Sequence, residues 1–329
     1  MASIKLFLLA LLSNLLLVGA SEVDDVHKSL KTVKMLLKAI DEYPSQHSEE
    51  SMVNIAFPLH QIVDEKKWNP NDSKHHMAIQ WLTFGDDFHE EMSPKELLQR
   101  YVLSVLYFST KGDDWKVCSR TKTSECADGT GFERFLSPRS VCHWYGIHCN
   151  KNDYITMIDL ADNGLNGNLS EELMLLHDSL VFLWVHDNPL DGSLPTWLGG
   201  FDKLESLSLF RTNIKGSIPS SFENLKSLRY LRLHENDLSG TLPSNVFSQM
   251  KRLEWLWLHT NSFQGKIPDS IGLLSNLQGL SLNGISFDGQ SNDFPNDICN
   301  LRQYNLRTLW TNCEDENGRK GCECCTSCV

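Results

Sequence analysis

A repeat of about 24 residues between Ile155 and Pro268 is the feature that most constrains the fold of this 329-residue chain. Each copy has apolar residues, mostly leucines, at fixed positions, and most copies then carry an asparagine. The copies begin at Ile155, Leu180, Leu204, Leu228 and Leu253. Because so short a unit cannot bury its own apolar side chains, it must stack on its neighbours. The pattern therefore predicts a solenoid, whose function lies on a surface.

The physical roles within one copy follow from its pattern. The first apolar positions form a short strand, and the asparagine turns the chain by bonding to neighbouring backbone groups. These residues are those of the leucine-rich repeat. The ending Gly-x-Ile/Leu-Pro resembles the plant-type class, and it occurs at Gly192 to Pro195, Gly216 to Pro219, Gly240 to Pro243 and Gly265 to Pro268. The resemblance implies an α/β repeat solenoid, a leucine-rich-repeat horseshoe with a parallel concave sheet and disulfide-stapled caps at both ends.

The flanking copies are degenerate, as terminal units that cap a solenoid usually are. A sixth copy starts at Leu277, but Ile285 stands in its asparagine position and Phe294-Pro295 comes about three residues late. Leu306 to Thr311 is expected to be the last strand. The repeats are thus assigned to residues 155–312, and a cysteine-rich tail to 313–329.

Residues 1–20 read as a signal peptide. Lys5 precedes the apolar run Leu6 to Val18, and small residues end at Ala20. That run is shorter than the roughly 20 residues of a spanning helix. We expect a secreted or cell-surface, extracellular protein; the alternative is that the leader is retained as an anchor.

All ten cysteines flank the main array of repeats. They are Cys118, Cys126, Cys142, Cys149, Cys299, Cys313, Cys322, Cys324, Cys325 and Cys328. Even counts on each side, on the secretory route, favour disulfide-stapled caps, with Cys142 and Cys149 as the preferred pair. Zinc held by the four cysteines from Cys322 to Cys328 is the alternative. Because disulfides are favoured in an oxidising compartment, no cofactor and no metal are expected.

The net charge and the composition limit the classes of molecule that this protein could bind. The formal net charge is −12, so the basic footprint that nucleic-acid binding needs is missing.

The acidic extension 21–92 is predicted to be partly helical: apolar residues recur every three or four positions between Glu22 and Tyr43. From Pro44 to Met92 the extension is expected to be poorly packed. Asn71 and Asn168 lie in glycosylation triplets.

Residues 93–154 are expected to form a helical, cysteine-containing cap. Ser93 to Glu96 reads as a capping box with proline in the first turn, followed by a helix over Leu97 to Phe108. With Gly112 to Trp115 and Cys142 to Cys149, this stretch resembles the N-terminal cap of plant-type leucine-rich repeats. It also resembles the secreted or membrane-attached repeat proteins numerous in diatoms. Plant relatives implied by the resemblance include receptor ectodomains, co-receptors and inhibitors of wall-degrading enzymes.

The candidate site is the concave face of the predicted sheet. Side chains between the leucines point outward, and equivalent residues of successive copies form columns about 4.8 Å apart. Seven aromatic residues and three histidines fall in these columns, a density that indicates a binding surface. The predicted ligand-binding residues are Trp184, His186, Tyr230, Arg232, His234, Trp255, Trp257 and His259.

Less specific interpretations stay open beside this one. The aromatic residues could only pack on each other across the repeats. The histidines are read as solvated surface residues, with metal binding by His234 and His259 as the alternative. Asp162 and Asp187 lie on adjacent rungs, but an open sheet cannot exclude water from such a carboxylate pair.

Catalytic signatures are missing from the sequence: no phosphate-binding glycine loop, no Gly-x-Ser-x-Gly and no His-Glu-x-x-His occurs. The sequence therefore predicts a non-catalytic binding protein, not an enzyme, with a peptide, protein or glycan ligand. The alternatives are an inhibitor of a secreted wall-degrading enzyme, a wall-associated structural protein, and a receptor ectodomain. The last would be attached to the membrane through its leader or a co-receptor.

Overall fold

The computed structural model describes residues 23–42, 74–86, 92–122, 126, 131–285, 295–311 and 324–328. These residues belong to two compact units. Unit 1 is made from Met1–Tyr154 and Leu169–Leu176, and unit 2 from Ile155–Asn168 and His177–Val329. The predicted leader, together with Asn71, Cys313 and Cys322, lies outside the described residues.

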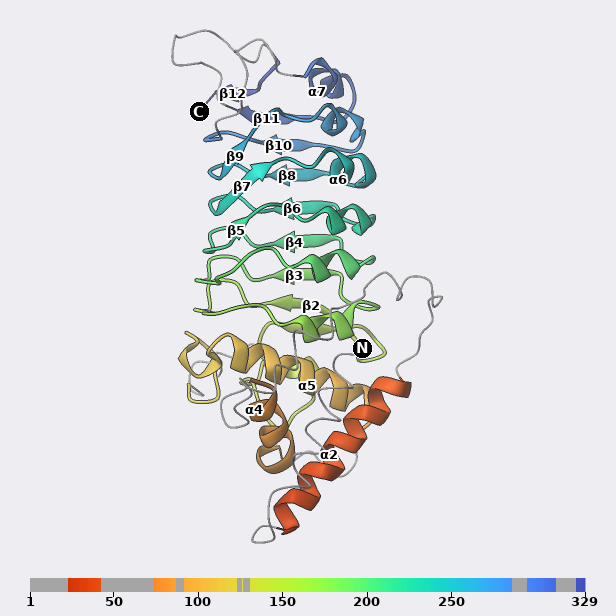
Figure 1. Ribbon diagram of the computed structural model, residues 1–329, viewed down its shortest axis with the longest axis vertical. Coiled ribbons are helices and arrows are strands. Elements are labelled where there is room, and N and C mark those ends of the chain that lie inside the picture. The colour runs from red at the N-terminus through yellow and green to blue at the C-terminus, as the bar shows by residue number, and fades with distance from the viewer. Residues whose placement is uncertain are drawn as a thin grey trace. The chain divides into compact units, whose positions relative to one another are not determined.

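Unit 1 is mainly helical. Its elements are α2 (Val23–Glu42), α4 (Lys74–Gln80), the π-helical segment η2 (Trp81–Gly85), α5 (Pro94–Ser109), the short helices η3 (Gly112–Asp114), η5 (Val141–His143) and η6 (Glu171–Leu176), and the strand β1 (Ile147–Cys149). Both α2 and α4 pack against α5 (Figure 1). Since α5 is buried over most of its length, it is the central helix of this unit.

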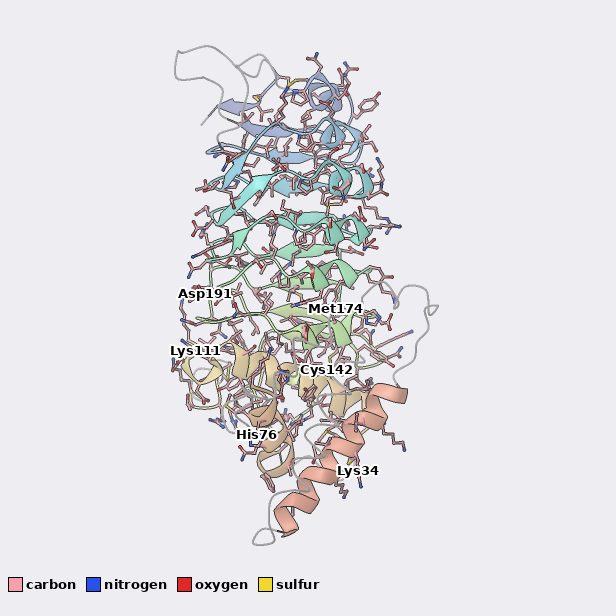
Figure 2. All side chains as sticks on the ribbon, in the orientation of Figure 1. Lys34, His76, Lys111, Cys142, Met174 and Asp191 are labelled. Carbon is pink, nitrogen blue, oxygen red and sulfur yellow. A yellow bond between two sulfur atoms is a disulfide. The ribbon has the colours of Figure 1, made fainter. Side chains whose placement is uncertain are left out.

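The helix predicted from apolar spacing between Glu22 and Tyr43 is confirmed as α2. Val33 and Ile40 of the predicted stripe are at most 1% exposed, but the buried residue between them is Leu36 and not the predicted Leu37, which is half-buried. Lys34 lies on the exposed side of the helix (Figure 2). Burial of one stripe at three- and four-residue spacing is what an amphipathic helix requires.

The start of α5 differs in one respect from the predicted capping box. The Ser93 Oγ accepts a hydrogen bond from the Glu96 N–H at 3.2 Å, as expected. The Glu96 carboxylate, however, accepts from the Val141 N–H at 3.1 Å. It therefore joins α5 to η5, next to the predicted disulfide Cys142–Cys149, which is present. A second disulfide of this unit joins Cys118 to Cys126.

A fully buried ion pair organises the centre of unit 1. The Arg100 guanidinium donates to both carboxylate oxygens of Asp86, at 2.6 Å each, and both side chains are 0% exposed. The rings of Trp81 and Trp144 lie 5.2 and 5.1 Å from the guanidinium carbon. The expectation that residues 44–92 are poorly packed is thus wrong for Lys74–Asp86, because this charge pair and its aromatic neighbours anchor them on α5.

Replacing Asp86 by asparagine should cost about 3 kcal/mol or more of unfolding free energy, since the buried Arg100 charge loses its bidentate partner and keeps only the Glu96 carboxylate, 3.6 Å away. Urea unfolding monitored by circular dichroism measures this loss. Asp153→Asn is the matched control, because Asp153 forms an exposed pair with Lys95 at 3.9 Å and exposed pairs contribute about 1 kcal/mol or less. Equal losses in the two variants would contradict the assigned role of Asp86.

Unit 2 is built on a parallel sheet whose strands lie one above another (Figure 1). The strands pair in the order β2 (Ile155–Asp159), β3 (Phe182–Trp184), β4 (Ser206–Ser208), β6 (Tyr230–Arg232), β8 (Trp255–Trp257), β10 (Gly279–Ser281), β11 (Thr308–Thr311) and β12 (Ser327–Cys328). Every pair is in register, so that Leu183, Leu207 and Leu231 face one another on successive strands. These leucines are 0% exposed, which confirms the predicted stacking of repeats.

Repeats of unit 2 return to the next strand through short helical segments, and the repeats at Leu204, Leu228 and Leu253 also carry a strand of a second sheet. Short helical segments lie along one side of the strands: η7 (Thr196–Gly200), η8 (Ser220–Asn224), α6 (Ser244–Gln249), η9 (Asp269–Leu273), α7 (Asn296–Asn300) and η10 (Leu301–Gln303). A smaller parallel sheet lies on the other side, formed by β5 (Lys215–Gly216), β7 (Asp237–Thr241) and β9 (Ser262–Gln264) (Figure 1). This second sheet begins at the asparagine turn and ends on the plant-type Gly-x-Ile/Leu-Pro residues.

The predicted role of the repeat asparagine is confirmed by its bonds. The buried Asn188 amide donates to the Leu160 and Val185 carbonyl oxygens at 2.8 and 3.0 Å. Its carbonyl oxygen accepts from the backbone N–H groups of Asn163 and Leu165 at 3.0 and 2.9 Å. One side chain therefore satisfies buried polar groups of two successive repeats. Asn236 and Asn261 repeat this arrangement.

Asn188→Ala should lower the unfolding free energy by about 3 kcal/mol, because four buried backbone groups lose their partner. Thermal or urea unfolding of the full chain measures the loss. Asn213 is an exposed asparagine in the same part of the repeat array, and Asn213→Ala should change stability by about 0.5 kcal/mol or less. A small effect of Asn188→Ala would show that the asparagine does not hold the turn.

The C-terminal end of the sheet extends beyond the predicted last strand. β12 pairs with β11 in parallel, with Trp310 opposite Ser327, so the expectation that Leu306 to Thr311 ends the sheet is wrong. The disulfide Cys299–Cys324 joins α7 to the residues just before β12, and Cys325 is disulfide-bonded as well. Two of the four cysteines of the alternative zinc site are thus oxidised.

Within the described residues, no helix combines the length and apolarity needed to cross a membrane.

Candidate functional site

The strand register aligns the outward residues into three columns, which together form the concave face. Two columns lie on the strands. The first is Met157, Phe182, Ser206, Tyr230, Trp255 and Gly279, and the second is Asp159, Trp184, Ser208, Arg232, Trp257, Ser281 and Trp310. The third column, just after the strands, includes His186, Phe210, His234 and His259. All eight predicted ligand-binding residues are therefore brought onto one continuous surface.

Small residues make room for the large rings on this face. A Cβ atom on Gly279 would lie 2.3 Å from the Trp255 ring, so a larger residue there would displace the indole. Ser206 and Ser208 are at most 2% exposed, and the Trp184 Nε1–H donates to the Ser206 Oγ at 2.9 Å. The tryptophans thus lie half-buried across the neighbouring strand, which fixes their position before any ligand arrives.

Arg232 lies at the centre of the concave face between two aromatic rings. Its guanidinium carbon is 5.2 Å from the centre of the Trp257 ring and 5.6 Å from that of Tyr230. These are cation–π distances. The Arg232 Nε is buried and has no hydrogen-bond partner among the described residues. Burial lowers the pKa of this guanidinium from its ordinary value.

The neighbouring arginines are held by acids, unlike Arg232. Arg211 contacts Asp187 at 2.9 Å and Glu235 at 3.1 Å. These pairs form a ladder along one edge of the face. The described part of the chain has no carboxylate within ion-pair distance of Arg232, so this central cation is not neutralised locally.

A matching ladder runs along the other edge of the face. Arg229 contacts Glu254 at 2.7 Å and Glu205 at 3.4 Å. Both ladders cross successive repeats, and each guanidinium lies between two acids. Arg211 and Arg229 are thus already paired with acids, whereas Arg232 lies between the two ladders without such a partner.

The third column forms a continuous ring stack. The ring centres of His186 and Phe210 are 4.1 Å apart, those of Phe210 and His234 4.3 Å, and those of His234 and His259 4.3 Å. His234 is only 4% exposed. The interpretation of the histidines as solvated surface residues is therefore wrong for His234, because its ring is covered on both faces.

Phe210 is the member of this stack that sequence reasoning left out of the site. Its position in the third column was visible in the repeat alignment, but alignment alone does not reveal ring contact. The packing alternative considered for the aromatic residues thus describes this column well. Since the stack occupies its own ring faces, stacking with a ligand is left to the Trp184 and Trp257 column.

The stacked histidines are poor proton acceptors. Burial, together with the neighbouring His259, Arg211 and Arg232, lowers the pKa of His234 to about 3. Burial also lowers the pKa of His186 and of His259. All three imidazoles are therefore neutral at pH 7. Protonation at lower pH places a positive charge on a ring that the fold keeps uncharged.

Protonation makes the stability of unit 2 depend on pH. The unfolded chain takes up a proton at His234 below about pH 6.5, whereas the folded chain does so only near pH 3. Stability from this residue is full above pH 6.5 and falls as the pH drops, by about 2 kcal/mol between pH 7 and pH 5. Urea unfolding in EDTA-containing buffer at these two pH values should show the loss. His234→Phe keeps a ring in the stack and should reduce the loss by that amount; an unchanged pH dependence would contradict this assignment.

Comparison with known proteins agrees with this architecture. The family model for the leucine-rich repeat matches residues 179–201, 203–225, 227–248 and 252–274. Two relatives from Arabidopsis thaliana are the calmodulin-binding receptor kinase CaMRLK, 34% identical over 104 residues, and phytosulfokine receptor 1, 31% identical over 93 residues. The chain is a leucine-rich-repeat protein of the plant type. The two matched segments make up 30% and 28% of this chain but only 15% and 9% of the two relatives.

A solved structure supports the same fold over a longer stretch. The crystal structure of a plant ice-binding protein superposes with a TM-score of 0.53, covering 68% of this leucine-rich-repeat protein and 64% of that chain. At 22% sequence identity, the likeness shows the fold and nothing about the ligand. The resemblance to diatom proteins and the glycosylation of the exposed Asn168 stay predictions.

Proposed function

We propose that this protein is a non-catalytic, secreted or cell-surface binding protein that recognises a peptide or protein ligand on the concave face. The observation that carries the proposal is the Arg232 guanidinium, held between Tyr230 and Trp257 without an acid. A half-buried, partly desolvated cation interacts strongly with an incoming anion. We therefore infer that the ligand presents a carboxylate, with an aromatic or apolar group beside it.

The two charge ladders support this choice of ligand. Because Arg211 and Arg229 are each neutralised by two acids, a highly charged polymer gains little at the edges of the face. A single anionic group placed over Arg232 gains more, since no internal contact has to be broken. The naming of one sequence relative as a phytosulfokine receptor supports a receptor-like role in ligand binding.

Binding is favoured over catalysis by the state of the acids on this face. The Asp187 carboxylate accepts a hydrogen bond from Arg211 at 2.9 Å. Asp162, on the adjacent rung, is exposed. A carboxylate pair that hydrolyses glycosides works in a site that excludes bulk water, and an open face with one acid bound to an arginine is not such a site.

Affinity capture from extracellular and cell-wall fractions identifies the ligand, and charge removal then tests the site. Arg232→Gln should weaken binding of the captured ligand at least tenfold, as expected for a central hot-spot residue. Arg211→Gln is the matched control, because it removes an arginine of the same face that is already neutralised; it should change affinity about twofold or less. Isothermal titration with the purified ligand measures both.

Three outcomes would refute the proposal. Equal binding by wild-type protein and Arg232→Gln would place the site elsewhere. A captured hydrolase that loses activity in a one-to-one complex would favour the inhibitor alternative, and retention on insoluble wall polymer would favour a structural role. Trp257→Ala, with its fold verified by thermal melting, separates loss of the anion contact from loss of the ring.

A further inference from the structure

We propose that His234, Glu235 and His259 form a binding site for a divalent transition metal of the zinc class. One potential ligand atom from each of the three residues lies within 4.8 Å of the other two. Two imidazole nitrogens and a carboxylate oxygen form a ligand set that suits zinc and leaves a fourth position open. The site goes beyond the proposed ligand binding, since Arg232 and its two aromatic rings are not part of it.

The His259 side chain is held in a form that can bind metal. The Ser281 hydroxyl donates its proton to the Asn283 Oδ1 at 2.8 Å. It can therefore only accept from the His259 Nδ1, which lies 2.9 Å away. This places the ring proton on Nδ1 and the lone pair on Nε2. A metal-ligating histidine usually donates its other ring N–H to such a partner.

The Glu235 carboxylate is oriented in a similar way. Its Oε2 accepts a hydrogen bond from the Arg211 Nε at 3.1 Å, and Arg211 is itself held by Asp187. The other oxygen, Oε1, lies 4.0 Å from the His234 Nε2. One carboxylate oxygen is thus fixed by an arginine, and the second points toward the histidine pair.

His234 supplies the third ligand from inside the ring stack. Packing between Phe210 and His259 fixes its imidazole. The positive charge of Arg211 is offset by its two acids, and Arg232 is the remaining cation facing the site.

Metal binding requires the two imidazoles to leave their parallel arrangement. Their planes now differ by 18°, whereas zinc needs nitrogen atoms about 2.0–2.1 Å from one ion and lone pairs that converge on it. His259 is partly exposed and is the last ring of the described stack, so rotation of its ring can provide the opening. Binding should therefore change the histidine ring resonances and the environment of Trp257, whose ring centre is 5.5 Å from that of His234.

The test uses the full chain, kept oxidised, treated with EDTA and then titrated with zinc chloride in a calorimeter. We expect one equivalent to bind, with affinity reduced at least tenfold in His259→Phe and in Glu235→Gln. Ser281→Ala should reduce it by a smaller factor. Nitrogen-15 spectra of the histidine rings in the zinc-free protein should show the Nδ1–H form of His259.

Two controls match these variants. His186→Phe alters the same ring stack outside the ligand set, and Glu254→Gln removes an arginine-binding carboxylate from the other edge of the face; both should keep wild-type zinc affinity. Glu235 is 40% exposed at its side chain, so Glu235→Gln keeps the test valid if His259→Phe fails to fold. Absence of zinc binding, or undiminished binding in both ligand variants, would overturn the proposal. Neither result bears on the Arg232 test, which is performed in EDTA.

Discussion

The buried asparagine amide is the interaction on which the arrangement of unit 2 depends. A leucine core alone holds repeats together without fixing their relative position, because apolar contact is non-directional. The Asn188 side chain, bonded to backbone groups from two repeats, sets one repeat against the next. In the third copy Thr212 takes this position, and its hydroxyl donates to the Leu209 carbonyl oxygen while its N–H donates to Asn236. The ladder thus continues through a copy that lacks the asparagine.

Fixed register is what turns isolated residues into a surface. Because Tyr230 lies opposite Trp255 and Arg232 opposite Trp257, side chains from different repeats meet at distances set by the strand spacing. The same spacing, close to the thickness of a stacked ring pair, allows His186, Phe210, His234 and His259 to stack. The position of a ring within the repeat therefore decides whether it stacks on rings of the neighbouring repeats or faces solvent.

The sequence predicts the strands and columns of unit 2 because both follow from a local, repeated pattern. It does not predict which histidine is buried, since that depends on side-chain conformation around Phe210. The packing of Lys74–Asp86 was missed because it rests on a charge pair with Arg100, fourteen residues away, in a segment without apolar periodicity. β12 was missed because a two-residue strand in a cysteine-rich tail carries no alternation to detect.

The short strand β12 has a consequence for how these molecules behave in concentrated solution. A parallel sheet that ends abruptly offers a row of free backbone groups to which another chain can add, which is a route to fibres. Among the described residues, the last strand of the sheet has two residues, and the Cys299–Cys324 bond lies just before it in the chain. Such a short strand exposes few backbone hydrogen-bonding groups and does not easily separate from β11. Reduction of that bond should therefore expose the longer edge of β11 and promote end-to-end association.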